Sequence, residues 1–320
     1  MYVRLIFLYL SLLSLTLLQN CQQIPTITST ATSRQISWNP SPGTSWQIQL
    51  QGEINTSIDA ELYVIDLFDT PQSVMDELHA VDRMVVCYFS AGSWEEWRSD
   101  AEEFPEEVIG IPLADWPGEY WLDIRHAETR KIMEQRLDLA QYKGCDGVDP
   151  DNVDSYTHET GYPLTGEDQL DYNRWLATKA RQRDLTVGLK NDLLQIPELV
   201  ADFDWVINEQ CFVYDECELL QPFIEAGKPV FTIEYEGNRA NICRLANDMG
   251  FDTLFKTMDL LDEWFYCRNE YGISNEIFLP LAIIGGVRSQ LNVSQKETSL
   301  APEIPTPSAD SKRVLGRTNY

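Results

Sequence analysis

The stretch ETRKIMEQRLDLAQYKGCDGVDPD, residues 128–151, joins a helix pattern to a strand pattern and decides the fold class. Apolar residues recur at helical spacing over 128–142. Lys143 and Gly144 then supply a basic last turn and a glycine that tolerates a left-handed stop. The run DGVDPD (146–151) that follows is short and apolar at its centre, which is typical of a strand. This order predicts one unit of an α/β fold.

The same alternation extends in both directions along the chain. Further strand-like runs lie at 46–52, 62–68, 84–90, 186–191, 205–210, 229–235 and 253–258, and further helix-like segments lie at 73–81, 170–183 and 239–250. Strands that alternate with helices run parallel, and a total of eight favours closure into a barrel. The sequence therefore predicts a single (β/α)8 TIM barrel over 46–270. A doubly wound open sheet is less favoured, because no strand is followed by a Gly-rich phosphate loop.

The two ends of the chain have a different composition. Residues 1–20 contain Arg4 and an apolar run that is too short to cross a bilayer, which is typical of a secretory signal peptide. Residues 21–45 are rich in Ser, Thr and Pro and predict a linker, while 271–320 predicts a disordered tail. Because Cys21 follows the signal directly, the alternatives are a freely secreted protein and one with a lipid anchor at Cys21.

Charge and cysteine content narrow the partners and the compartment. The chain has 51 acidic and 24 basic residues and a formal charge of −27, which repels nucleic acid and favours cationic partners. No obligate protein partner is evident. Seven cysteines in an exported chain indicate oxidation, and local pairings of Cys211 with Cys217 and of Cys243 with Cys267 fit their positions. Cys87 and Cys145 lie inside apolar strand patterns and are expected to be small buried residues.

Carboxylates follow several of the predicted strands, and in a barrel the active site lies where strands end. The strand-end candidates are Asp66, Asp149, Asp151, Asp154, Lys190, Asn191, Glu209, Glu234 and Glu236. Burying such groups costs free energy, so several that converge on one mouth indicate a site. The long connection after 84–90 adds Glu95 and four tryptophans, Trp94, Trp97, Trp116 and Trp121. Stacking of one of these rings on a ligand and packing of all four on the rim remain equal alternatives.

Three kinds of chemistry could use these carboxylates. The DPDNVD stretch (149–154) resembles a cation loop in composition, but it lacks the glycine and the distal glutamate of a calcium-binding EF-hand. Nucleophilic Ser or Cys chemistry needs a nearby histidine, and none of His79, His126 and His158 ends a strand. Cleavage of a glycosidic bond requires two carboxyl groups and no cofactor, and crowding of like charges can keep one protonated beside an ionised neighbour.

Six motifs occur in order along the chain: WQIQLQG (46–52), YFSAGSWEEWR (88–98), PGEYWLDIR (117–125), GVDPDNVD (147–154), KND (190–192) and NEQCFVYDEC (208–217). Together they resemble glycoside hydrolase family 114, whose members are endo-α-1,4-polygalactosaminidase-like enzymes on a (β/α)8 barrel. The resemblance covers about 46–267. It implies cleavage within α-1,4-linked galactosamine-containing polysaccharide, with retention of configuration and no cofactor. A partly deacetylated polymer of this kind is cationic, and an acidic cleft would concentrate it.

The resemblance also implies roles for individual residues. The family's catalytic aspartate matches Asp151 and its catalytic glutamate matches Glu209. Asp149 remains an alternative for the first role, because strand alternation points it to the same side as Asp151. The implied substrate contacts are Asp66, Trp94, Glu95, Asp154, Lys190, Asn191, Glu234 and Glu236, and the family pattern fits the two cysteine pairs. A non-catalytic carbohydrate-binding barrel and a metal-dependent hydrolase that uses the aspartates of 149–154 remain the competing hypotheses.

Overall fold

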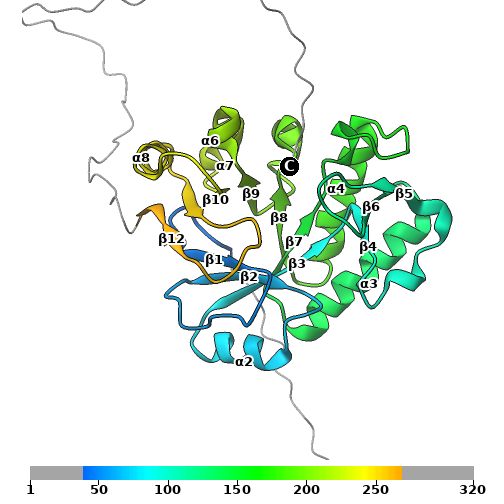
Figure 1. Ribbon diagram of the computed structural model, residues 1–320, viewed down its shortest axis with the longest axis horizontal. Coiled ribbons are helices and arrows are strands. Elements are labelled where there is room, and N and C mark those ends of the chain that lie inside the picture. The colour runs from blue at the N-terminus through cyan, green and yellow to red at the C-terminus, as the bar shows by residue number, and fades with distance from the viewer. Residues whose placement is uncertain (1–38, 269–320) are drawn as a thin grey trace, which may run out of the picture. The chain divides into compact units, whose positions relative to one another are not determined.

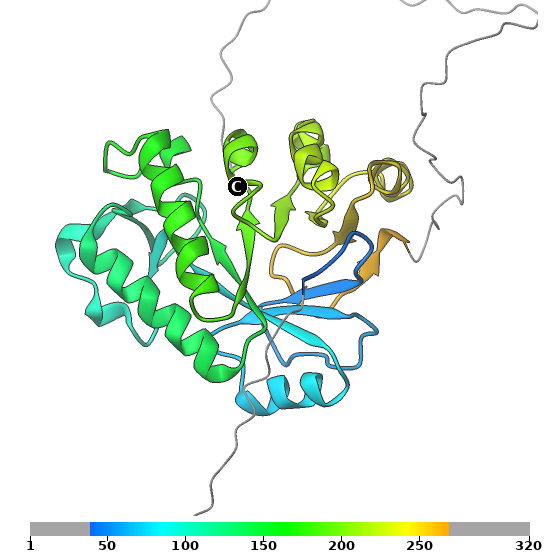
Figure 2. The same cartoon turned by 180° about the vertical axis from the view of Figure 1, so that it is seen from behind.

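The computed structural model describes residues 39–268, in which a nine-stranded sheet forms an α/β fold. Eight strands run parallel in chain order: β1 (Trp46–Gln49), β2 (Leu62–Asp66), β3 (Met84–Ser90), β7 (Gly147–Asp151), β8 (Thr186–Lys190), β9 (Trp205–Glu209), β10 (Val230–Glu234) and β11 (Asp252–Phe255). The short strand β12 (Phe265–Tyr266) pairs antiparallel with β11. Figures 1 and 2 show that the sheet curls and that the helices lie outside it.

The curled sheet is not fully closed, which corrects the prediction of a closed barrel. Its strand order begins at β1 and ends at β12, and within 39–268 no ladder of strand hydrogen bonds joins these two ends. Individual hydrogen bonds connect the two edges of the sheet instead. The Trp46 indole donates to the Asp252 carbonyl (2.8 Å), the Trp264 indole donates to the Trp46 carbonyl (2.9 Å), and the Leu50 amide donates to the Leu260 carbonyl (3.0 Å). The loop after β11 therefore takes the place of direct pairing between β1 and β11.

The four long helices are α2 (Gln72–Ala80), α3 (Ala127–Lys143), α4 (Gly166–Arg181) and α8 (Arg239–Met249), close to the four predicted segments. Helix α3 ends at Gly144, whose φ of 82° lies in the left-handed region that the Lys-Gly pair predicted. Short helices α5 (Ile196–Leu199), α6 (Cys211–Tyr214) and α7 (Gln221–Glu225) follow β8 and β9, where no long helix was predicted.

Alternation along the strands creates two apolar layers. One packs between the sheet and the helices, and the other fills the barrel interior with Trp46, Trp205, Phe231 and their neighbours. The interior is tight at Gly188, where an added Cβ would lie 2.1 Å from the indole nitrogen of Trp205. Because successive side chains point to opposite faces, the interior positions of a strand continue at every second residue up to its carboxyl end.

A small antiparallel sheet is inserted between β3 and β7, in the long aromatic connection. It contains β4 (Ser93–Glu95), β5 (Ile109–Pro112) and β6 (Glu119–Leu122), in the order β4-β6-β5. The insertion starts at Gly92, where an added Cβ would lie 1.7 Å from the Asn152 carbonyl oxygen. Only glycine fits there, so the inserted sheet rests directly on the residue that follows Asp151.

Three disulfides tie the described residues together. Cys211–Cys217 and Cys243–Cys267 are the two pairs that the sequence suggested. Cys87 and Cys145 are buried, as expected, and they also form a third bond, which the sequence analysis did not anticipate. This bond joins the middle of β3 to Cys145, two residues before β7 begins.

The predicted signal peptide, Cys21, residues 21–38 of the predicted linker and the predicted tail lie outside the described residues. Within the described part, the chain reaches β1 at Trp46, the residue at which the folded domain was predicted to begin. None of the helices in 39–268 combines the length and the apolar character that a membrane span requires.

Candidate active site

Strand alternation brings two carboxylates to the mouth of the barrel. Trp205 and Ile207 of β9 belong to the interior layer, so the next residue in that series is Glu209. On β7 the same spacing puts Asp149 and Asp151 on one side. The side chains of Asp151 and Glu209 are 18% and 26% exposed, whereas Asp149 is fully buried. Asp151 and Glu209 are therefore the pair that a ligand can reach.

Lys190, the last residue of β8, lies between these two carboxylates. Its Nζ is 3.2 Å from Asp151 Oδ1 and 3.9 Å from Glu209 Oε1. The sum of these distances limits the separation of the two oxygens to about 7 Å, which excludes most of the ~6.5 to 9.5 Å range of inverting glycosidases. Burial lowers the pKa of Lys190, but Asp151, Glu209 and Asp149 outweigh it and raise that pKa above its usual value. The lysine therefore remains a cation between the carboxylates.

Two tyrosines complete the contacts of the pair. The hydroxyl of Tyr88, on β3, donates to Asp151 Oδ2 (3.0 Å), and the hydroxyl of Tyr235, just after β10, donates to Glu209 Oε1 (2.5 Å). Burial and the adjacent carboxylate raise the pKa of each tyrosine well above its usual value, so both remain donors. The Asn191 side-chain oxygen accepts from the Glu209 amide (3.1 Å). Each carboxylate is thus fixed by groups from neighbouring strands.

The two tyrosines were missed in the sequence, although a signal for them was present. Phe231 and Ile233 of β10 face the interior, and Tyr235 continues that series. Tyr88 likewise continues the series that contains Val86 on β3. A search restricted to carboxylates overlooks such residues, while a count of every second position would have found them.

Asp149 lies behind the exposed pair. Burial, with a further contribution from Asp151 and Glu209, raises the pKa of Asp149 to about 7, against the opposing effect of Lys190. Neither of its carboxyl oxygens has a hydrogen-bond partner among the described residues. A carboxyl group in this position holds a proton near neutral pH, while the pair in front of it faces the mouth.

A chain of hydrogen bonds leads from the pair to a further buried acid, Glu119 of β6. The Asn152 side chain donates to Ser90 Oγ (2.9 Å), Ser90 Oγ lies 2.6 Å from Ser93 Oγ, and Ser93 Oγ donates to Glu119 (2.9 Å). Burial and the nearby Glu95 raise the pKa of Glu119 to about 7. This residue was also missed, because its strand belongs to the inserted sheet.

Three of the predicted substrate contacts, Asp66, Glu95 and Trp94, have partners within the protein. Both oxygens of Asp66 accept from Arg98 (3.0 and 2.8 Å), and Glu95 lies 2.8 Å from the same guanidinium. Asp66 is 4% exposed and Glu95 is 2% exposed. The indole of Trp94 donates to the Ala101 carbonyl (3.0 Å) and packs edge-on against Tyr120. These three side chains support the rim of the barrel.

The remaining predicted contacts lie apart from the pair. Glu234 is on the helix-facing side of β10, where it accepts from the Phe212 amide (3.1 Å) and where burial raises its pKa to about 7. Glu236 is exposed beyond β10. Asp154 lies 3.8 Å from the imidazole of His158. Within 39–268, no three His, Cys, Asp or Glu side chains are arranged to hold a metal ion.

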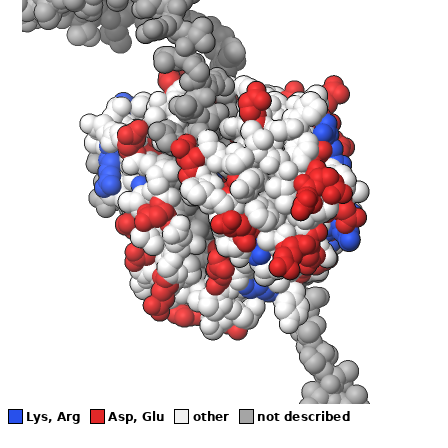
Figure 3. Space-filling model, turned by 45° about the vertical axis from the view of Figure 1, so that its right-hand side comes forward, with Lys and Arg blue, Asp and Glu red and all other residues white. Residues whose placement is uncertain are grey.

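Of the four tryptophans in the insertion, two are packed and two are exposed. Trp94 is partly buried, and Trp121 is 6% exposed and stacks on His158. Trp97 and Trp116 are 51% and 42% exposed. Figure 3 shows that acidic side chains are spread over one face of the described surface and outnumber the basic ones there.

Comparison of this chain with known proteins identifies a matching family and similar proteins. The model of Glycoside-hydrolase family GH114 matches residues 27–272. The crystal structure of Aspergillus fumigatus Ega3 in complex with galactosamine is 43% identical, with a TM-score of 0.70, covering 72% of this chain and 98% of that chain. An uncharacterized protein of Deinococcus radiodurans is 29% identical over 227 residues, 61% of this chain and 73% of its own length.

A more distant structure shares the fold alone. The glycoside hydrolase domain of PelA from Pseudomonas aeruginosa is 14% identical, with a TM-score of 0.57, covering 69% of this chain and 97% of that chain. Because so few residues are shared, the likeness concerns the path of the backbone and carries no residue role.

Proposed function

Because the chain belongs to glycoside hydrolase family GH114, we propose that it hydrolyses galactosamine-containing polysaccharide at internal α-1,4 linkages, with retention of configuration. The observation that carries this proposal is the pair Asp151 and Glu209, which share the Lys190 ammonium at the mouth of the barrel. The galactosamine bound to the 43% identical Ega3 supports the sugar class. The enzyme is thus a polygalactosaminidase-like glycoside hydrolase.

The reaction proceeds in two displacements. Glu209, as a carboxylic acid, donates its proton to the glycosidic oxygen while an Asp151 oxygen attacks the anomeric carbon and the C–O bond breaks. The product is a glycosyl ester on Asp151 and a free chain end. Glu209, now a carboxylate, takes a proton from a water molecule that attacks the same carbon and releases Asp151. Two inversions give net retention.

The neighbouring residues position this pair. Lys190 and Tyr88 hold two different oxygens of Asp151, which fixes the orientation of the nucleophile. Tyr235 holds Glu209 Oε1 and leaves Oε2 for the glycosidic oxygen. Asp149 is buried behind the pair and keeps its proton, so that it adds no full negative charge to Asp151 at acidic pH. Asp151 is therefore the better nucleophile of the two.

Substitution of the pair tests the proposal. Asp151→Asn and Glu209→Gln should each lower hydrolysis of deacetylated galactosaminogalactan about 10²- to 10⁴-fold, measured as new reducing ends. Circular dichroism should show unchanged folding, and the surface variant Asp184→Asn should keep full activity. Full activity in both site variants would overturn the assignment. Loss in Asp149→Asn, with activity kept in Asp151→Asn, would transfer the nucleophile role to Asp149.

The configuration of the first product tests the stereochemistry. NMR of the earliest products should show the α-anomer, because two displacements restore the original configuration. Initial release of the β-anomer would replace the two-step reaction with a single displacement by water.

The compartment follows from the disulfides and the proposed leader. Three disulfides within 39–268 fit an extracellular protein. We propose that residues 1–20 direct export and that Cys21 is the site at which a lipid would attach. Mass spectrometry of the mature N-terminus distinguishes a free end from an acylated Cys21, and an intact Met1 would contradict export through a cleaved signal.

A further inference from the structure

A hollow opens at the strand-end edge of the barrel, and residues from three separated segments line it. It has a volume of about 390 Å³ and is lined by Gln51, Asp115, Trp116, Met258 and Asp259. This volume falls within the ~300 to 1,000 Å³ range of ligand sites. None of the residues described above as part of the Asp151–Glu209 site lines it.

The topology places this hollow on the same edge as the catalytic pair. Gln51 follows the carboxyl end of β1, and Met258 and Asp259 follow the carboxyl end of β11. Asp115 and Trp116 form the turn between β5 and β6, in the insertion between β3 and β7. In the sheet, β3 and β7 are the third and fourth strands, whereas β1 and β11 are the first and the eighth. Because the β5–β6 turn lines the same hollow as the residues that follow β1 and β11, it reaches across the barrel mouth. A polymer that lies across the mouth meets this hollow.

Both walls of the hollow are held in place. Two backbone hydrogen bonds close the β5–β6 turn. The Leu113 amide donates to the Glu119 carbonyl (2.9 Å), and the Glu119 amide donates to the Trp116 carbonyl (3.1 Å). On the opposite wall, Thr257 donates to Asp259 (2.5 Å). Asp115 has a φ of 68°, a left-handed conformation that aspartate tolerates in turns. The hollow is therefore formed before any ligand binds.

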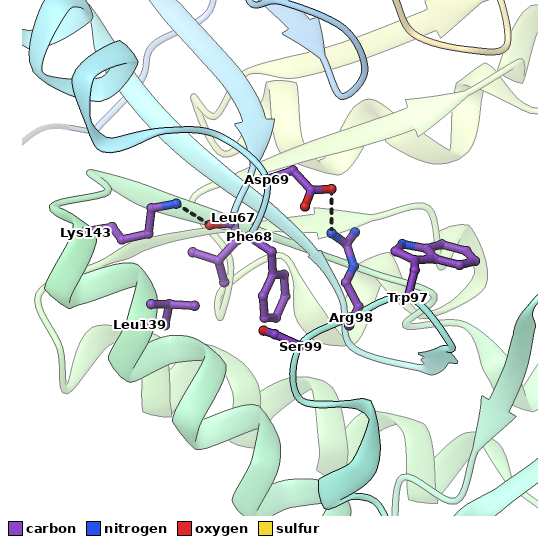
Figure 4. A pocket seen from close by; sticks show the side chains of 8 residues that line it. All are labelled: Leu67, Phe68, Asp69, Trp97, Arg98, Ser99, Leu139 and Lys143. Atoms are coloured by element: carbon purple, nitrogen blue, oxygen red, sulfur yellow. Dashed lines mark hydrogen bonds and ion pairs between the residues drawn. The ribbon is translucent and has the colours of Figure 1, made fainter.

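Its chemistry differs from that of the other hollow of the same volume. That other hollow, also about 390 Å³, contains an exposed tryptophan, Trp97, but Arg98 and Lys143 line it as well (Figure 4). Trp116 is instead accompanied by two exposed carboxylates, and no Lys or Arg is among the described lining residues. An indole face packs against the C–H face of a sugar ring, and carboxylates attract an ammonium group. Of these two hollows in the described residues, the one beside Trp116 suits a cationic sugar.

We propose that Trp116, Asp115 and Asp259 form a distal subsite that binds a hexosamine unit with a free, protonated amine. The inference rests on the proposed function, and it adds a specificity element outside the catalytic pair. The indole stacks on the pyranose ring, and the two carboxylates hold the ammonium. A chain long enough to reach from Asp151 to this subsite binds more tightly than a short one, and acetylation of the distal unit removes the gain.

Equilibrium binding tests the subsite independently of catalysis. With the full-length Glu209→Gln protein, calorimetry should show that long deacetylated galactosamine oligomers bind at least tenfold more tightly than fully N-acetylated ones of equal length. Adding Trp116→Ala should weaken the deacetylated oligomer about tenfold, and adding Asp115→Asn with Asp259→Asn should weaken it by about three- to tenfold. Raising the salt from about 0.15 M to 1 M should remove most of the carboxylate contribution.

Matched controls separate the subsite from general effects. Tyr142→Ala removes another exposed aromatic side chain, 87% exposed at the end of α3, and Asp184→Asn removes another aspartate with positive φ. Neither variant should change the affinity. In the active enzyme, Trp116→Ala should raise KM on the long polymer about tenfold and leave kcat unchanged, while the values for the shortest cleaved oligomer stay the same.

The outcomes distinguish this inference from the proposed function. Equal affinity for acetylated and deacetylated oligomers, or unchanged affinity in Trp116→Ala, overturns the subsite even if the enzyme is active. A protein that hydrolyses no galactosamine polymer but shows the Trp116-dependent binding overturns the proposed function and supports the subsite. A fall in kcat with KM unchanged in Trp116→Ala would also overturn the subsite, because Trp116 would then act in the chemical step.

Discussion

Two clusters of buried charge lie at the strand-end edge of the same sheet, and their composition differs. The β2–β4 cluster contains Asp66, Glu95 and Asp100 with Arg98 and Arg136, and the β7–β9 cluster contains Asp149, Asp151 and Glu209 with Lys190. In the first cluster, guanidinium groups contact all three carboxylates. In the second, a single ammonium is shared by three.

The geometry of the cations explains the different behaviour. Arg98 donates twice to Asp66, and Arg136 donates twice to Asp100, with distances of 2.8 to 3.0 Å. Planar guanidinium groups bind carboxylates in this two-point manner and fix them. A single lysine cannot satisfy three acids, so one oxygen of Glu209 remains for a substrate and Asp149 keeps a proton. Two-point contacts to guanidinium groups thus build the rim, and a larger excess of carboxylates over cations builds the site.

Removing the cation from each cluster should give the largest difference. Arg98→Met leaves Asp66 and Glu95 buried without their main partner, which should cost about 3 to 5 kcal/mol in urea unfolding while the folded fraction stays active. Lys190→Met should cost less stability, because Asp149 already carries a proton near neutral pH. It should instead lower turnover about 10²-fold, because the carboxylates lose their fixed charge partner.

The opposite result would break the comparison. If Arg98→Met abolished turnover in a folded protein, the β2–β4 cluster would belong to the catalytic machinery. If Lys190→Met kept full turnover, the shared ammonium would have a structural role only.

Loss of the disulfide between β3 and the segment before β7 should have the next largest effect. Replacing both Cys87 and Cys145 by Ala opens a covalent loop of 58 residues between β3 and β7. The free energy of unfolding should fall by about 2 to 4 kcal/mol, because the unfolded chain gains freedom. The turnover of the folded protein should change little, since Tyr88 and Asp151 remain on paired strands. Loss of turnover without loss of stability would show that the bond sets the position of Asp151.

The pH dependence of stability should identify the proton held by Asp149. Its folded pKa, about 7, lies above the usual value near 3.8, so the folded state binds this proton more tightly. The stabilisation is complete below about pH 4 and is lost as the pH rises through 7. Asp149→Asn should remove a change of roughly 3 to 4 kcal/mol in the unfolding free energy between pH 4 and pH 8. Thr232→Val, buried and uncharged, should leave the slope intact, and an unchanged slope in Asp149→Asn would contradict the assignment.

The smallest predicted effect concerns the hydroxyl that holds Glu209. Tyr235→Phe removes one hydrogen bond to a carboxylate, which should lower kcat about tenfold, or about 1.4 kcal/mol. Tyr63→Phe removes a buried hydroxyl that donates to the Ile58 carbonyl far from the site, and it should leave kcat unchanged. Equal kcat values for the two variants would mean that Lys190 and the backbone already position Glu209.

The sequence predicted the strands and the carboxylates at their ends because both depend on local pattern, whereas the family resemblance singled out Asp151 and Glu209 among those carboxylates. Short apolar runs and their periodicity place Asp151 and Glu209 at strand ends without knowledge of distant contacts. The partners of Asp66 and Glu95 could not be predicted, because they depend on where the Arg98 side chain reaches across the insertion. Closure of the barrel also could not be predicted, because it depends on how the loop after β11 packs against β1. The position of Tyr235 could be predicted, because it continues the interior-facing series of Phe231 and Ile233 on β10.

The three disulfides also affect how the chain acquires its fold. Each bond joins a cysteine to the next one along the described sequence, 87 to 145, 211 to 217 and 243 to 267, so the three loops neither nest nor cross. Six cysteines allow 15 connectivities, and this is the one that a chain emerging from its N-terminus can form in order. Each partner arrives before the next pair begins. Oxidative folding of this domain should therefore need little isomerase-driven reshuffling.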